Sequence, residues 1–417
     1  MCQRFNMVSV WERLNRFWER YNPKSLFTNQ EEEQTNEMLK NEFKKNGLKA
    51  VKKFLDKELD SWTNINLNVA VTGSSGSGKS SFINSLRHVR PSQPGAAEVG
   101  ARGETTKECT PYEHPENKSF IVWDLPGVGT GFFPKKSYLE DVQYDKYDFF
   151  VIISKDRFTE DDFWLAGEVT KQKKRFFFVR SNIDTDITNN KRDYPDQDVA
   201  SFLQSMKTDT KEALKKVSEA NPEVFLISNI ETDKYDFGSL NNEMLFSCKS
   251  LKRDALALSL SAVTREIIDD KKRVLTNRIH SVAIKITTTS NKNEQKRIFQ
   301  DEITTYQKQF NIDDETLKEN KDILTLTDDN LKEFRVAFDQ FEYGDDAGIK
   351  MKTPTAMRDA TTLWNRLADF FTWSREDKLL YGFSRSALQN NLELLYQQSN
   401  SFFDETRLAK MVCAISK

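Results

Sequence analysis

The strongest constraint on the fold is a glycine-rich stretch between Leu67 and Leu86, LNVAVTGSSGSGKSSFINSL. Its centre, Gly73 to Ser80, fits the pattern G-x-x-x-x-G-K-[ST], with an apolar run of strand length before it and an amphipathic segment after it. In that context the glycines let successive N–H groups point inward at phosphate oxygens, the lysine reaches the β- and γ-phosphates, and the last hydroxyl ligates Mg²⁺. The stretch therefore predicts a nucleotide-phosphate site inside an α/β domain.

The apolar pattern around this loop supports that fold class. Runs of strand length occur at Ile65–Thr72, Ser119–Asp124, Tyr147–Ser154, Arg175–Arg180 and Glu223–Ser228. Segments of helical length separate them, at Lys79–His88, Glu160–Lys171 and Val199–Ala220. Near-continuous apolar strands that alternate with helices predict a mainly parallel sheet with helices on both faces.

Both ends of the chain have helical periodicity. We expect a helical N-terminal segment over residues 1–64, a P-loop domain over 65–247 and a C-terminal helical domain over 248–417. The C-terminal part reads as long amphipathic helices joined by short polar turns, without a strand. The two helical ends could also merge into one domain.

Charge and composition exclude several classes of protein. Lys plus Arg number 62 and Asp plus Glu number 64, which argues against a dedicated nucleic-acid binder. No apolar run approaches the roughly 20 residues of a membrane span, and the four cysteines form no metal-binding spacing. We expect a soluble cytoplasmic protein, with His88, His114 and His280 too scattered to form a metal or catalytic site.

Eight residues of the glycine-rich loop are our candidates for phosphate contact. They are Gly73, Ser75, Gly76, Ser77, Gly78, Lys79, Ser80 and Ser81. Lys79 is also the candidate catalytic cation, and Ser80 is the first candidate ligand of Mg²⁺.

A second motif, Asp124-Leu125-Pro126-Gly127, follows the next predicted strand. An aspartate at that place can hold Mg²⁺ through water, and the Gly127 N–H can donate to the γ-phosphate. The alternative is an Asp-capped turn, but the distance of about 45 residues from the first motif favours a sensor of the γ-phosphate.

The polar stretch Pro91–Pro111 lies between these motifs, where a switch loop would cover the nucleotide. Thr105 or Thr106 would offer a hydroxyl to Mg²⁺ and the γ-phosphate, and we prefer Thr106. The alternative that neither threonine ligates the metal stays open.

The base is predicted from the residues after the last two strands. Ser181-Asn182-Ile183-Asp184 occupies the place of an [NT]KxD motif, in which the carboxylate accepts hydrogen bonds from guanine. Asn182 stands where a lysine is usual. Ser228 and Asn229 could direct a backbone N–H at the guanine O6. We favour guanine; the alternatives are a solvated turn at Asp184 and an ATP-using enzyme.

With these residues assembled, the chain resembles the immunity-related GTPases, the interferon-inducible family of dynamin-like GTPases. The resemblance extends over about residues 60 to 240. It rests on LNVAVTGSSGSGKSSFINSLR, PGAAEVG, TPYEHP, VWDLPGVGTGFFPKKSYLE, YDKYDFFVIIS, RFFFVRSNIDTDI and FLISN. Lys79 is typical of the group with GKS in this loop.

The resemblance implies binding and hydrolysis of GTP, GTP-dependent self-assembly, and action at intracellular membranes in cell-autonomous immunity. It implies that hydrolysis is activated across a dimer, with Glu104 as the catalytic switch-loop glutamate. Val128 stands where many GTPases carry a water-orienting glutamine, which also predicts slow hydrolysis by a single copy.

Two alternatives remain open. The chain could be a nucleotide-bound regulatory or membrane-tethering scaffold with negligible turnover. The helix predicted over Met7–Tyr21, with Cys2 beside it, and the segment Ala360–Trp373 could contact a membrane peripherally or could pack within a helical core.

Overall fold

The computed structural model of the chain describes residues 29–99, 108–129, 133–155, 158–215, 223–248, 250–319, 342–344, 348–350 and 384–400. The chain divides into two compact units. The first comprises residues 1–57, 275–300 and 340–389, and the second comprises 58–274, 301–339 and 390–417. The division passes through four of the described helices, and the domain boundaries expected from the sequence stay a prediction.

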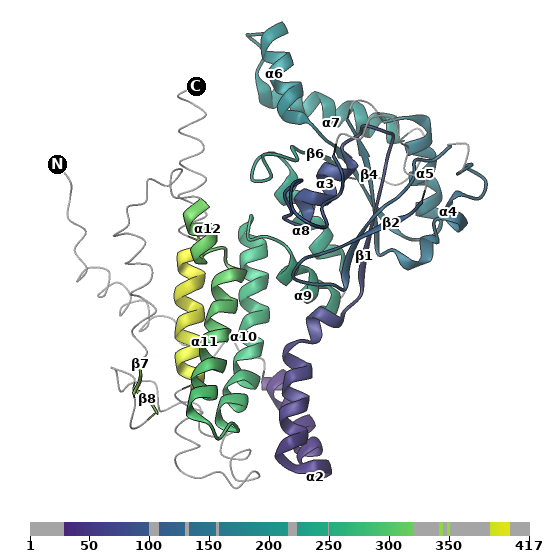
Figure 1. Cartoon of the computed structure of the whole chain (residues 1–417). Coiled ribbons are helices and arrows are strands. Elements are labelled where there is room, and N and C mark those ends of the chain that lie inside the picture. Colours follow the sequence, from purple (N-terminus) through teal and green to yellow (C-terminus); the bar gives the residue numbers. More distant parts are fainter. Residues whose placement is uncertain are drawn as a thin grey trace, which may run out of the picture. The chain divides into compact units, whose positions relative to one another are not determined.

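The second unit contains a six-stranded sheet with the strand order β2-β3-β1-β4-β5-β6 (Figure 1). The strands are β1 (Leu67–Thr72), β2 (Thr110–Glu113), β3 (Phe120–Asp124), β4 (Phe149–Ser154), β5 (Arg175–Arg180) and β6 (Val224–Leu226). β2 pairs antiparallel with β3, and every other pair is parallel. The mainly parallel α/β fold expected from the sequence is confirmed.

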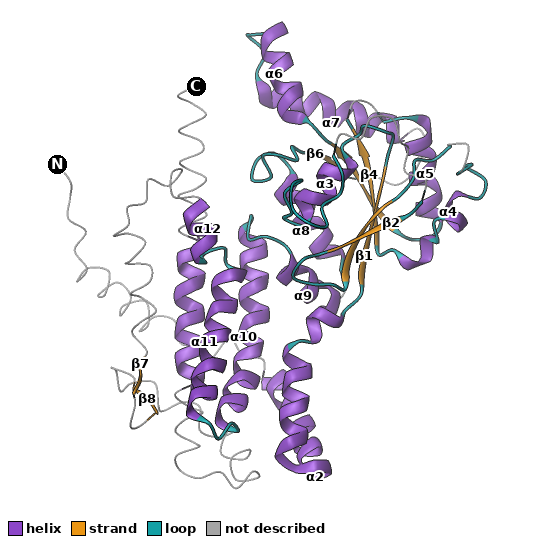
Figure 2. Cartoon of the chain, viewed as in Figure 1, coloured by secondary structure: helices purple, strands orange, loops and turns teal. Residues whose placement is uncertain are grey.

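Helices cover both faces of this sheet (Figure 2). One face packs on α3 (Lys79–Leu86), α8 (Phe237–Ser247) and α9 (Ser250–Ser259). The other packs on α4 (Tyr138–Asp141), α5 (Glu160–Lys171), α6 (Ile183–Asp193) and α7 (Val199–Lys215). Because side chains alternate along a strand, Val69 and Val71 of β1 enter the first core while Ala70 enters the second. Burial on both faces explains why these strands read as continuous apolar runs.

Two elements differ from the sequence-based expectation. The end of the predicted polar loop forms edge strand β2, and α6 occupies residues for which the sequence predicted no helix. β2 is half-exposed and contains Pro111, so it lacks the apolar signal of a central strand. Helix α7 is described to Lys215 and not to the expected Ala220, because residues 216–222 lie outside the described part of the chain.

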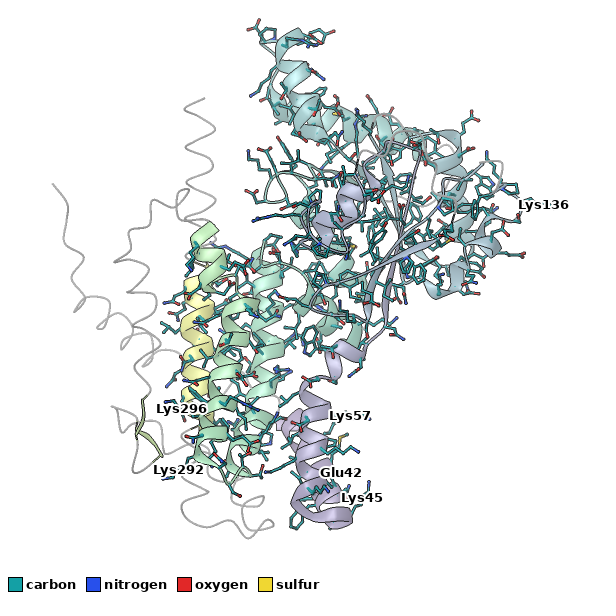
Figure 3. The ribbon with its side chains drawn as sticks, in the orientation of Figure 1. Glu42, Lys45, Lys57, Lys136, Lys292 and Lys296 are labelled. Atoms are coloured by element: carbon teal, nitrogen blue, oxygen red, sulfur yellow. The ribbon has the colours of Figure 1, made fainter. Side chains whose placement is uncertain are left out.

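In the first unit, α2 (Asn29–Leu59) packs on α10 (Arg265–Thr287). Leu39, Val51 and Leu55 share a buried cluster with Ala283 and Ile284. Segments from both ends of the chain therefore form one core, as one reading of the sequence proposed. The exposed side of α2 carries i,i+3 ion pairs such as Glu42–Lys45, at 2.8 Å (Figure 3).

The remaining elements are mostly helical. They are η2 (Ser61–Asn64), η3 (Tyr144–Lys146), α11 (Lys292–Gln309), α12 (Asp314–Glu319) and a helix over 384–400. The expectation of a purely helical C-terminal region is wrong at β7 (Glu342–Gly344) and β8 (Gly348–Lys350), which form a hairpin. The glycines at 344 and 348 disfavour a helix there.

No helix in the described ranges is long and apolar enough to cross a membrane. The segments Met7–Tyr21 and Ala360–Trp373, proposed as membrane contacts, lie outside the described residues, as does Cys2.

Candidate functional site

The loop after β1 wraps into a cradle that needs glycine at two positions. Gly73 has a φ of +149°, and a Cβ added there would lie 2.0 Å from the carbonyl oxygen of Ile153. Gly78 has a φ of +91° and forms the left-handed N-cap of α3, so the helix begins at Lys79. A Cβ on Gly76 would meet no atom within 4 Å. The cradle therefore fits a nucleotide phosphate.

Lys79 lies over its own loop. Its Nζ donates to the carbonyl oxygens of Gly73, at 2.9 Å, and Ser74, at 3.1 Å. Burial lowers the pKa of Lys79, and the nearby carboxylates of Asp124 and Asp162 oppose that shift. A half-buried ammonium held by backbone carbonyls is suited to receive the charge of a phosphate chain.

The Asp124–Gly127 motif packs directly against this cradle. Asp124 ends β3 with 7% of its surface exposed, and the Leu125 N–H donates to Val71 O at 2.8 Å. A Cβ on Gly127 would lie 3.4 Å from the carbonyl oxygen of Gly73, so the two loops approach backbone to backbone. The two motifs, about 45 residues apart in the chain, meet at one place.

Tyr138 fixes this second loop, and the sequence analysis did not identify it. Its buried hydroxyl donates to Pro126 O at 2.7 Å and lies 3.0 Å from Thr72 Oγ1. Burial raises the pKa of Tyr138, which keeps the phenol a neutral donor. The local sequence KKSYLE gives no sign of this role, because the contact depends on where β1 and α4 lie in the fold.

The start of α5 also reaches this site. A Cβ on Gly129, with a φ of +77°, would lie 2.6 Å from Asp161 Oδ2, so that glycine lets the carboxylate approach the loop. Asp162 is buried and accepts hydrogen bonds from Thr159, which caps the helix. Burial raises the pKa of Asp162, and the hydrogen bonds from Thr159 oppose the rise.

On the side predicted to hold the base, Ser181 bonds to the cradle itself. Its Oγ donates to the carbonyl oxygen of Ser77 at 2.7 Å, which joins the end of β5 to the glycine-rich loop. Asn182 adopts a left-handed conformation, with a φ of 59°, and begins α6. Asp184 lies in the first turn of α6, half-buried. Asparagine is among the residues that adopt this left-handed backbone most often.

The residues after β6 also contact the glycine-rich loop and α3, on the side predicted to hold the base. Ser85 Oγ of α3 donates to Asn229 O at 2.6 Å, and Asn229 Nδ2 donates to Gly78 O at 3.4 Å. Ser228 Oγ accepts from the backbone N–H groups of Ile230 and Glu231. The fold thus brings the four predicted motifs around one loop.

Three predicted site residues cannot be placed. Glu104, Thr105 and Thr106 lie in residues 100–107, outside the described part of the chain. The stem before them is held by Asn84 of α3, whose amide donates to Ala97 O at 2.8 Å and accepts from Ala97 N at 2.7 Å. In the described ranges, no group of three His, Cys, Asp or Glu side chains could hold a metal ion.

Curated relatives share part of this chain's sequence. Interferon-inducible GTPase 1 of Mus musculus is 40% identical over 224 residues, which is 54% of this chain and 53% of that protein. Interferon-gamma-inducible GTPase 10 of Mus musculus is 37% identical over 259 residues, 60% of this chain and 62% of that protein. The aligned region spans about half to two thirds of the length of these relatives.

Among solved structures, a GTP-binding protein of Sulfolobus solfataricus in complex with GDP is 15% identical, with a TM-score of 0.28 over 53% of this chain and 67% of that one. NFeoB from S. thermophilus, bound to GDP, AlF4⁻ and K⁺, is 12% identical, with a TM-score of 0.29 over 78% of this chain and 99% of that one. The profile of the family described as Interferon-inducible GTPase (IIGP) matches residues 32–381, which is most of the sequence. The chain therefore belongs to the interferon-inducible GTPase family.

Proposed function

We propose that this protein binds GTP with Mg²⁺ and hydrolyses it to GDP and phosphate. The observation that carries the proposal is the meeting of four separate motifs at one loop, above all the hydrogen bond from Ser181 to Ser77 O. That bond ties the predicted guanine-reading segment to the predicted phosphate cradle. Membership of the interferon-inducible GTPase family supports the same activity.

We assign each group a role that its motif suggests. The loop amides and Lys79 hold the β- and γ-phosphates, the Gly127 N–H donates to the γ-phosphate, and Asp184 accepts from guanine. Mg²⁺ would be held by Ser80, by Thr106 and through water by Asp124, and it would neutralise charge on the phosphates.

Self-assembly is the second part of the proposal. Val128 follows Gly127 at a place where many GTPases orient the attacking water, and an isopropyl group cannot form that hydrogen bond. A facing copy, with Glu104 in the switch loop of each, would complete the site. We place the protein in the cytoplasm with peripheral contact to intracellular membranes, in cell-autonomous immunity.

The test is a titration of purified full-length protein at saturating GTP, with turnover measured per molecule. A rate per molecule that rises with protein concentration supports an enzyme activated by assembly. GTP that is bound but unhydrolysed at every concentration would reject the enzyme and favour the scaffold, the second candidate, which Val128 and Asn182 favour.

Two variants make the titration specific. Lys79→Ala should lose turnover about a hundredfold or more at all concentrations, because it removes a cation from the phosphates. Glu104→Ala should bind GTP normally and lose the rise with concentration. A Glu104→Ala protein with a normal rise would exclude the proposed role of that carboxylate.

A further inference from the structure

A second cavity lies at the opposite end of α3 from the glycine-rich loop, within the unit that contains the sheet. Its volume is about 1260 Å³, and its wall includes Arg87, His88, His114 and Lys271. No residue of the loop from Gly73 to Ser80 lines it. The cavity is therefore separate from the proposed GTP site.

Two cations in this wall are buried and form no ion pair with any acidic residue that the structure describes. Arg87 is 4% exposed and Lys271 is 2% exposed. Arg87 donates to two backbone carbonyls, Glu113 O at 2.9 Å and Gly95 O at 3.1 Å, while Lys271 donates to Gln309 Oε1 at 2.6 Å. In the described part of the chain neither has a carboxylate within 4 Å, although buried charges are normally paired.

Two further donors in the same wall have no acceptor. The Nη1 of Arg87 and the Nε2 of His114 are buried, and neither has a hydrogen-bond partner among the described residues. His114 Nδ1 accepts from the Glu116 N–H at 3.3 Å, so in the neutral ring the proton lies on Nε2. His114 therefore presents an unused N–H donor beside an unused guanidinium nitrogen.

These groups form one cluster. The His88 and His114 rings lie 6.4 Å apart edge to face, and the His114 ring stacks on Phe120. Burial, together with the neighbouring His88, Arg87 and Lys271, lowers the pKa of His114 to about 3. Glu116 is the acid whose field reaches Lys271, from beyond ion-pair distance. The cluster thus combines the guanidinium of Arg87, the amine of Lys271 and the N–H donor of a neutral His114.

We propose that this cavity is an anion site for a phosphate-bearing small molecule, with Arg87, His114 and Lys271 as its donors. An anion would pair both buried cations and satisfy both orphaned N–H groups at once. The volume far exceeds that of a bare phosphate and lies above the roughly 300–1,000 Å³ of typical small-molecule sites, so such a ligand would fill only part of the cavity. Acidic side chains also line the cavity, including Glu116, Glu266 and Glu315, so the ligand carries polar groups besides its phosphate.

Binding of an anion in this cavity would affect the nucleotide site. Arg87 holds both stems of the loop that carries residues 100–107, through Gly95 before it and Glu113 after it. An anion bound to the Arg87 guanidinium would compete with its hydrogen bonds to Gly95 O and Glu113 O, and so would weaken the attachment of both stems. We expect the anion to alter GTP turnover while leaving the nucleotide-binding loop unoccupied by it.

The first experiment uses the unmodified, GDP-loaded protein, so that the nucleotide site is already filled. Pyrophosphate and glucose 6-phosphate are titrated at constant ionic strength against chloride, and the histidine ring signals are followed by NMR. The chain has only three histidines, so assignment is direct. We expect saturable shifts at His88 and His114, and none at His280, which does not line the cavity.

Two variants and a matched control locate the site. Lys271→Met and His114→Phe each remove one donor at similar volume and should weaken binding about tenfold to a hundredfold. Lys308→Met removes an exposed cation from the same cavity and should change affinity by less than about twofold. If a variant fails to fold, the NMR shifts of His88 and His114 in the unmodified protein still test whether the anion binds in this cavity.

A second arm distinguishes the source of the phosphate. Phosphatidylcholine vesicles containing phosphatidylinositol 4-phosphate are compared with the soluble probes; binding to vesicles alone assigns a lipid headgroup, and binding to soluble probes assigns a free metabolite. Absence of saturable shifts with every probe overturns the proposal and indicates a water-filled cavity. Equal affinity in Lys271→Met, His114→Phe and unmodified protein also overturns it. Neither result would affect the proposed GTPase activity.

Discussion

Helix α3 spans eight residues, roughly 12 Å, and its two ends offer anions different chemistry. The N-terminal end presents backbone N–H groups from a loop whose glycines permit the turn. The C-terminal end presents side chains, Arg87 and its neighbours His114 and Lys271, which come from three separate elements. Backbone donors carry no charge to desolvate, whereas burial of Arg87 and Lys271 has a cost that their hydrogen bonds to neutral oxygens offset only in part. In our proposal a bound anion would offset the remainder at the second end.

The largest loss of stability and of GTP binding should come from a substitution in the glycine-rich loop at the N-terminal end of α3. Gly73→Ala places a methyl group against Ile153 O, 2.0 Å from the added Cβ. Because that oxygen belongs to the backbone of β4, the loop or the strand must move. We expect a loss of about 3 kcal/mol or more in the free energy of unfolding and a loss of GTP binding, measured by denaturant titration and nucleotide fluorescence.

Gly76→Ala is the matched control for this change. Its Cβ meets nothing within 4 Å, so only its φ of +76° is costly. A loss of about 1 kcal/mol is expected. Equal losses in the two variants would contradict the contact with Ile153 as the cause.

Asn84 lies in α3 between its two ends and forms two hydrogen bonds with Ala97. A substitution of Asn84 tests how much these bonds contribute to stability. Asn84→Ala removes both hydrogen bonds to Ala97 and leaves a buried backbone N–H and C=O unpaired. We expect the free energy of unfolding to fall by about 2–4 kcal/mol, with faster hydrogen exchange around residues 95–99. Ser85→Ala, one residue on, should cost only about 1 kcal/mol; a larger loss there would place the main tether at Asn229 instead.

The base-reading side of the first end is tested by Asp184→Asn. A carboxylate accepts from both guanine N1–H and the 2-amino group, whereas an amide can also donate, to the 2-oxo group of xanthine. We expect affinity for GTP to fall about tenfold to a hundredfold and affinity for XTP to rise. Competition binding measures both. Unchanged preference for GTP would show that Asp184 is a solvated turn residue.

The smallest effect is the pH dependence at the second end. Burial lowers the pKa of Lys271 to about 7, against about 10.4 in an unfolded chain. Between these values the unfolded state binds the extra proton, so stability rises with pH; below about pH 7 both states are protonated and the burial cost is at its full size.

Lys271→Met should therefore be more stable than the unmodified protein at pH 7, by about 1 kcal/mol after the lost bond to Gln309, and the gain should vanish toward pH 10. Thermal unfolding across this range measures it. A constant difference at all pH values would show that the Lys271 ammonium is not desolvated as described.

The sequence predicted the glycine-rich loop and the strands around it well, because each of them is formed by residues that are consecutive in the chain. Each apolar run of strand length became a strand within a few residues of its expected bounds, since burial on both faces leaves a continuous pattern. The edge strand β2 and the short hairpin β7–β8 were missed, because neither has an apolar run. Tyr138, Asp161 and Asp162 were missed because their contacts cross the fold.

By itself, the sequence determined the α/β fold, the position of the glycine cradle and the family. The fold and the cradle depend on periodicity and on glycines within eight consecutive residues, and the family depends on motifs spread over about residues 60 to 240. Only the tertiary structure decided which distant groups meet. His88 and His114, set aside as scattered, lie 6.4 Å apart beside Lys271, which is more than 150 residues away in the chain. A cluster of side chains from separate elements leaves no local pattern, because each residue is placed by the packing of its own helix or strand.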